Sequence, residues 1–177
     1  MSGEMDKSIA MLATALEKEE RGRDFYRDAV SKCTNQLGKD IFKTLMEEEG
    51  IHIKRVKMIY DSLHSGKAWP GEWKSLKGMN EKLHELFQQR MVKLGPKVKA
   101  ESGDVEALDV GLGMEQGAID FYEAELGRAT DTLERDFISC MIGEERIHYE
   151  TLADMKFYFT NPESWFVEHE HHVLDGA

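Results

Sequence analysis

The sequence predicts an all-α protein, a four-helix bundle of two helical hairpins with a long crossover between the second and third helices. Three observations lead to this fold class. The 177 residues are rich in Glu, Lys, Leu and Ala and include only three prolines, a composition that favours helices. Apolar residues recur at three- and four-residue spacing in four long segments. Two of these segments repeat the pattern of the other two, 96 positions later.

The predicted elements form a single domain over residues 1–177. The first hairpin is expected over 6–65, with a turn at 31–40, and the second over 105–160, with a turn near 130–133. The crossover, 66–104, opens on a segment with Gly and Pro, and a helix of its own is expected over 79–94. This connection either returns along the bundle or forms a surface excursion, and the sequence leaves both open. Asn161 followed by Pro162 predicts a helix stop and a new start, which opens a short helical tail over 161–177.

Composition narrows the range of functions. The formal net charge of −11 argues against nucleic acid and anionic membranes as partners. No stretch approaches the roughly 20 apolar residues of a membrane span, and the N-terminus lacks a basic region followed by an apolar run, so we expect a cytoplasmic protein. Cys33 and Cys140 are isolated in the sequence, which leaves a disulfide framework or a cysteine-based metal site without support.

The strongest functional signal is a duplicated set of carboxylates and imidazoles. In each half, a lone Glu is followed 30 positions later by a Glu-x-x-His pair. The six residues are Glu19, Glu49, His52, Glu115, Glu145 and His148. A single Glu-x-x-His pair is weak evidence, because Glu is common on helices and most such pairs are solvated. Here all six fall on apolar stripes, where unpaired charge is costly, and the register is repeated, so the set predicts a two-metal site.

The spacing also predicts that the six side chains lie at one level of the bundle. The midpoints between each lone Glu and its paired Glu are residues 34 and 130, inside the two expected turns. Residues equidistant from the turn of a helical hairpin lie at the same height, here roughly 22 Å from the turn at about 1.5 Å per residue. Two divalent cations would balance the four carboxylates. Oxygen-rich sites with one imidazole per ion suit iron or manganese better than structural zinc.

An aromatic pair is repeated as well, as Phe25-Tyr26 and Phe121-Tyr122. The phenylalanines are expected in the core. Tyr26 and Tyr122 follow their lone Glu by seven residues, two helical turns along the same face. These tyrosines either pack in the core, hydrogen-bond near the site or serve as electron donors.

The paired E-x-x-[GA]-x-x-F-Y and E-x-x-H segments resemble rubrerythrin-like proteins of the ferritin-like superfamily over about residues 6–160. The resemblance implies a ferritin-like bundle with a centre of two iron ions, for which manganese or zinc can substitute. It implies that the six residues of the duplicated set are both the metal ligands and the catalytic residues. Rubrerythrins also carry a rubredoxin domain with four iron-binding cysteines, which this chain lacks. Their seventh ligand, a Glu, is replaced here by Ala118.

Three functions remain open from the sequence. The leading expectation is a di-iron oxidoreductase that reduces hydrogen peroxide, or dioxygen, to water in oxidative-stress defence, using an external electron donor such as a rubredoxin-like protein. The alternative is an iron-binding, ferroxidase or iron-storage protein without peroxidase turnover. A scaffold or sensor draws support only from the His-rich tail at 169–172. We expect a homodimer, in which exchange of hairpins between chains is conceivable.

Overall fold

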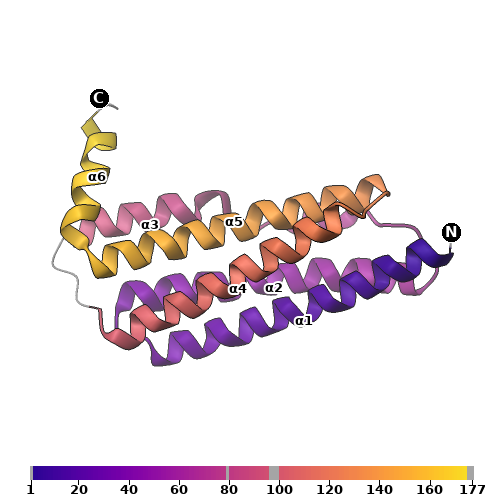
Figure 1. Cartoon of the computed structure of the whole chain (residues 1–177), viewed down its shortest axis with the longest axis horizontal. Helices are drawn as coiled ribbons and strands as arrows, with labels where there is room; N and C mark the ends of the chain where they lie inside the picture. Colours follow the sequence, from indigo (N-terminus) through magenta and orange to yellow (C-terminus); the bar gives the residue numbers. More distant parts are fainter. Residues whose placement is uncertain (1, 79, 96–99, 175–177) are drawn as a thin grey trace.

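The computed structural model describes residues 2–78, 80–95 and 100–174, and within these ranges every regular element is helical. The four long helices of the bundle are α1 (Ser2–Lys32), α2 (Gln36–His64), α4 (Ser102–Leu126) and α5 (Thr132–Thr160) (Figure 1). α1 packs on α2 as one hairpin, and α4 packs on α5 as the other. The predicted all-α bundle with a long crossover is therefore confirmed. No helix in the described ranges combines the length and the apolar character that crossing a membrane would need.

At the end of each hairpin turn, a side chain caps the helix that follows. Asn35 Oδ1 accepts hydrogen bonds from two backbone N–H groups at the start of α2, at 2.9 and 3.3 Å. Asp131 Oδ1 does the same at the start of α5, at 2.8 and 3.1 Å. Such caps satisfy N–H groups that have no partner within the helix. α2 therefore begins at Gln36, inside the segment 31–40 that the sequence analysis assigns to a turn.

The crossover is part of the core and not a surface excursion. It contains a 3-10 turn, η1 (Glu72–Ser75), and the helix α3 (Asn80–Leu94), which packs against α5 (Figure 1). Trp73 of η1 is buried, with its ring centroid 5.4 Å from that of Phe137 on α5. Phe87 of α3 is fully buried in the opposite part of the core. The helix expected over 79–94 is present from Asn80, and Met79 lies outside the described residues.

The tail forms α6 (Pro162–Leu174), which turns away from the bundle axis at one end (Figure 1). Trp165 anchors it, because this side chain is fully buried and its indole N–H donates to Asp154 Oδ1 of α5 at 2.6 Å. The His169 ring stacks on Trp165 with a centroid distance of 3.9 Å. The side chains of His171 and His172, also in the predicted histidine cluster, lie outside the described part of the structure.

Two apolar clusters fill the bundle, one on each side of a band of buried charge. One cluster includes Tyr26 and Phe42 near the turn of the first hairpin, and the other includes Leu12 and Ile59 toward the opposite end. The positions between them on all four long helices carry buried Glu and His side chains. Because charged groups without partners are expensive in such a place, the band marks the candidate site.

Candidate metal centre

The structure brings together all six residues of the duplicated set. α1 and α4 each supply one Glu, while α2 and α5 each supply a Glu and a His three residues apart, which places the two on one helix face. None of the six residues is more than 3% exposed. The equal spacing from turn to site in both hairpins is what brings them to one level.

The six side chains form two overlapping groups that could each hold one metal ion. In each group the ligand atoms lie within 4.8 Å of one another. The first group is Glu19, Glu49, His52 and Glu145, and the second is Glu49, Glu115, Glu145 and His148. Glu49 and Glu145 belong to both groups and are placed to bridge two ions, whereas Glu19 and Glu115 each belong to one.

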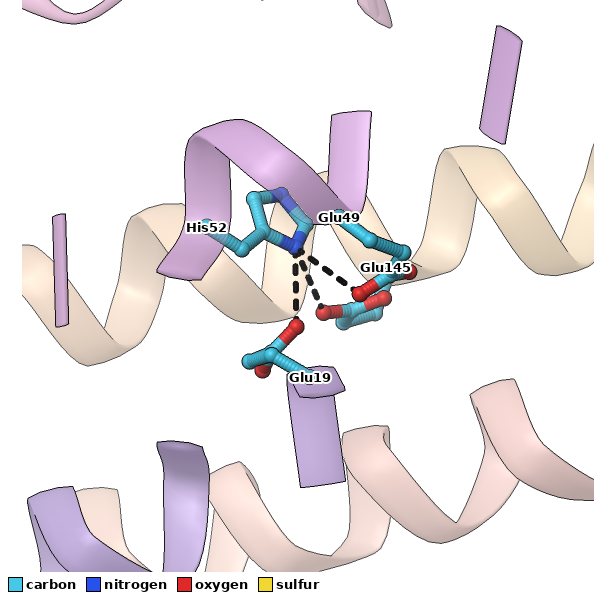
Figure 2. A group of neighbouring side chains, drawn as sticks. All are labelled: Glu19, Glu49, His52 and Glu145. Atoms are coloured by element: carbon cyan, nitrogen blue, oxygen red, sulfur yellow. Dashed lines mark hydrogen bonds and ion pairs between the residues drawn. The ribbon is translucent and has the colours of Figure 1, made fainter. Parts of the chain in front are cut away.

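In the first group, shown in Figure 2, His52 Nδ1 faces three carboxylates. It lies 3.1 Å from Glu19 Oε2 and 3.2 Å from Glu145 Oε1. Glu49 Oε2 is 3.8 Å away. One imidazole nitrogen and three carboxylates thus converge from α1, α2 and α5 on a small volume.

The second group repeats this arrangement about His148. Its Nδ1 lies 3.3 Å from Glu145 Oε2, 3.6 Å from Glu49 Oε1 and 3.8 Å from Glu115 Oε2. The two imidazole rings stack with their centroids 5.4 Å apart. Each half-site therefore offers one nitrogen and three carboxylates, of which two carboxylates are shared.

The two tyrosines hydrogen-bond to the lone glutamates, and each one bonds across the bundle. Tyr122 of α4 donates to Glu19 Oε1 of α1 at 2.6 Å, and Tyr26 of α1 donates to Glu115 Oε1 of α4. Each tyrosine thus donates a hydrogen bond to the lone Glu of the other hairpin, and not to the lone Glu that precedes it on its own helix. Burial, together with these carboxylates, raises the pKa of both phenols well above the ordinary value, so they remain protonated donors.

Glu144 is a functional candidate that the sequence analysis missed. Its Oε2 lies 2.9 Å from His52 Nε2, the ring nitrogen that points away from the cluster. Arg55 Nη1 donates to the same carboxylate, while Arg55 Nε donates to the Leu76 carbonyl of the crossover at 2.8 Å. Burial opposes ionisation of Glu144, but the hydrogen bonds from His52 and Arg55 outweigh it and lower the pKa to about 2. The sequence does contain a signal for Glu144, because a second Glu directly precedes the Glu-x-x-His pair in both halves.

Burial and mutual charge shift the pKa values of the carboxylates and imidazoles in this cluster. Burial, together with the charges of Glu145 and Glu19, raises the pKa of Glu49 well above its ordinary value. Burial and Glu145 raise the pKa of Glu115 to about 7. Burial favours neutral imidazoles, but the surrounding carboxylates outweigh it and raise the pKa of His52 and His148. These two histidines lower the pKa of Glu145, which lies between them, despite its burial.

The residues fit a pair of divalent cations. The buried Glu145 carboxylate has His52 Nδ1 and His148 Nδ1 at 3.2 and 3.3 Å, but neither contact has the geometry of a good hydrogen bond. Such a carboxylate is costly unless a cation binds it. The donor set of four carboxylates and two imidazoles suits iron or manganese, whereas structural zinc prefers sulfur and histidine. Two doubly charged ions would neutralise the four carboxylates and displace the protons.

The rubrerythrin family model matches residues 10–156, a span that contains all six site residues and both hairpins. The chain belongs to the rubrerythrin family. The match and the buried cluster together support di-iron binding, and no rubredoxin domain is indicated. No curated protein and no solved structure shows a significant similarity to the chain.

Proposed function

We propose that this rubrerythrin-family protein is a di-iron oxidoreductase that reduces hydrogen peroxide, or dioxygen, to water with electrons from a separate donor. The observation that carries the proposal is the pair of overlapping half-sites that share Glu49 and Glu145. A bound pair of Fe(II) ions would supply two electrons, which with two protons suffice to convert one hydrogen peroxide molecule to two water molecules.

The six site residues would hold the two ions. Glu19 and His52 would bind one ion, Glu115 and His148 the other, and the two shared carboxylates would bridge them. A carboxylate has two oxygens and can bind one ion or bridge two, which lets the same residues hold both oxidation states of iron. Six protein ligands remain because Ala118 occupies the position of the family's seventh.

Residues around the ligands would keep them in position. The Tyr122 hydroxyl restrains Glu19 at 2.6 Å, and Tyr26 restrains Glu115 in the same way. Glu144 accepts from His52 Nε2–H and so directs Nδ1 toward the carboxylates. The apolar clusters on both sides of the site limit its contact with water and with other reductants.

We propose that the electrons come from a separate protein, since the two cysteines in these 177 residues are too few for a rubredoxin-type iron site. A rubredoxin-like protein is a donor of suitable chemistry. The proposal also places the protein in the cytoplasm as a homodimer, for which size-exclusion mass is the direct test. A large cage would instead favour the alternative of iron uptake and storage.

The test is metal content followed by reaction with peroxide. Protein loaded anaerobically with Fe(II) should hold two irons per chain, and one equivalent of peroxide should oxidise both within seconds, producing a near-ultraviolet oxo-bridged absorption. Glu49→Ala should lose this iron, while Glu47→Ala, an exposed carboxylate on the same helix, should keep it. Two bound irons that ignore peroxide but react with dioxygen would support the ferroxidase alternative instead. Iron content unaffected by Glu49→Ala would refute the site itself.

A further inference from the structure

A cavity between α1 and α4 reaches the candidate metal centre from one side. Its volume is about 210 Å³, and all four site carboxylates contribute to its wall, whereas neither histidine does. The imidazoles come from α2 and α5, and Figure 2 shows His52 approaching the cluster from the side opposite Glu19. A molecule in this cavity would therefore meet the metal positions on the face that the imidazoles leave free.

Two glycines in α4 form part of the cavity wall without any packing reason for being glycine. At both Gly113 and Gly117, an added Cβ would have no neighbour within 4 Å. Gly111 is different, because a Cβ there would lie 3.1 Å from Leu152 Cδ1. Glycine inside a helix lowers stability relative to alanine. Gly113 and Gly117 therefore reduce helix stability, and what they provide is an open wall.

The internal repeat does not extend to Gly113 and Gly117. All six candidate ligands recur 96 positions apart, but the counterparts of Gly113 and Gly117 on α1 are Glu17 and Arg21. The two halves thus share the ligands but differ here, because the α4 side of the cavity carries no side chain at these two positions. Lys18 of α1 reaches across to α4, where its Nζ donates a hydrogen bond to the Gly117 carbonyl at 3.2 Å.

The inner end of the cavity is also lined by small residues. A Cβ at Gly22 would lie 3.3 Å from the Glu49 carboxyl group, so Glu49 faces the cavity with no side chain in front of it. Ala118 occupies the equivalent position on α4. Small residues therefore continue from the wall to the bridging carboxylate, and the space holds several water-sized molecules.

We propose that the cavity between α1 and α4 is the route by which small oxidants reach the metal centre, and that Gly113 and Gly117 determine access. The inference rests on the proposed function and adds the direction of approach and the size of the substrate. Hydrogen peroxide and dioxygen fit such a passage, and a larger side chain at the half-buried Gly117, or at Gly113 on the exposed rim, would narrow it.

The experiment compares Gly117→Leu and Gly113→Leu with a matched control, Gly143→Leu. Gly143 lies in α5 and away from the cavity, and its added Cβ also meets nothing within 4 Å. With two irons per chain, both α4 variants should react with peroxide at least about tenfold more slowly than the wild type, because entry then requires the new side chain to move. The control should keep the wild-type rate.

Azide provides a second readout that does not depend on turnover. Mixed with the oxidised protein and followed by stopped-flow absorption, it should bind the wild type and Gly143→Leu at the same rate and bind both α4 variants much more slowly. Alanine and valine at position 117 complete a series in which the rates of peroxide reaction and of azide binding should fall as side-chain volume rises, even if leucine impairs folding.

Wild-type rates of peroxide reaction and of azide binding in both α4 variants would overturn the route while leaving the proposed function intact. Failure of the wild type itself to react with peroxide would refute the proposed function instead. In that case the azide series would still decide whether the cavity is the path to the metals.

Discussion

Replacing Glu115 with glutamine should stabilise the metal-free protein above neutral pH. Glu115 is only 3% exposed, and burial, together with the charge of Glu145, raises its pKa from 4.5 to about 7. In the unfolded chain the group regains its ordinary pKa, so between these two values the folded protein binds a proton that the unfolded chain has lost. The corresponding stability is fully present below pH 4.5 and is lost as the pH rises through about 7.

The size of the effect follows from the two pKa values. A rise from 4.5 to about 7 corresponds to about 3 kcal/mol of stability lost on ionisation. Glutamine carries no charge, and its amide oxygen can still accept the hydrogen bond from Tyr26. The metal-free Glu115→Gln variant should therefore exceed the wild type by up to about 3 kcal/mol at pH 8 and by much less at pH 5.

Urea unfolding of the chelator-treated proteins between pH 5 and pH 8, followed by circular dichroism, measures this difference. Glu106→Gln is the matched control, because Glu106 is exposed on the same helix. With Fe(II) added, the order should reverse, since the wild type gains the binding free energy of two ions and the variant loses a ligand. A stability difference that stays constant from pH 5 to 8, or a variant less stable than the wild type at pH 8, would refute the reasoning.

Three further predictions concern positioning, packing and proton release. Glu144→Ala removes the carboxylate that orients the His52 imidazole, so one of the two Co(II) binding steps should weaken by roughly 10–100-fold. Unchanged affinities in both Co(II) binding steps would contradict this positioning role of Glu144. In thermal unfolding, Gly38→Ala should lower the stability of the folded protein by about 1–3 kcal/mol, because the added Cβ would lie 2.6 Å from Cys33 Sγ. Gly143→Ala, where the added Cβ meets nothing within 4 Å, should raise that stability by about 0.5–1 kcal/mol. Metal affinity should fall from pH 8 to pH 6, because the raised pKa of both site histidines makes binding displace protons. Calorimetry in two buffers of different ionisation enthalpy would detect that release.

Much of the site could be predicted because a helix converts sequence spacing into height and direction. The 30-residue interval from Glu19 to Glu49, repeated from Glu115 to Glu145, placed each lone Glu level with its Glu-x-x-His pair once the turns were located. The rise per residue is nearly constant in any helix, so no tertiary contact was needed for this step. The structure brings the side chains together as the spacing predicts.

The packing of the crossover was less accessible to sequence reasoning. Its helix was expected, but whether the segment lay on the surface or entered the core was open. Burial of Trp73 and Phe87 places it in the core. The sequence of one short segment shows which of its faces is apolar. It does not show which other helices cover that face.

The sequence by itself determined the helical class, the duplication and the six residues that share one level of the bundle. Only the tertiary structure decided which groups meet across hairpins: Tyr122 on Glu19, Glu144 behind His52, and the cavity beside Gly113 and Gly117. Helical periodicity specifies the face of one helix, whereas these contacts depend on the rotation and offset of two hairpins packed together. Those quantities are set by the fit of many side chains at once, which no local pattern in the sequence records.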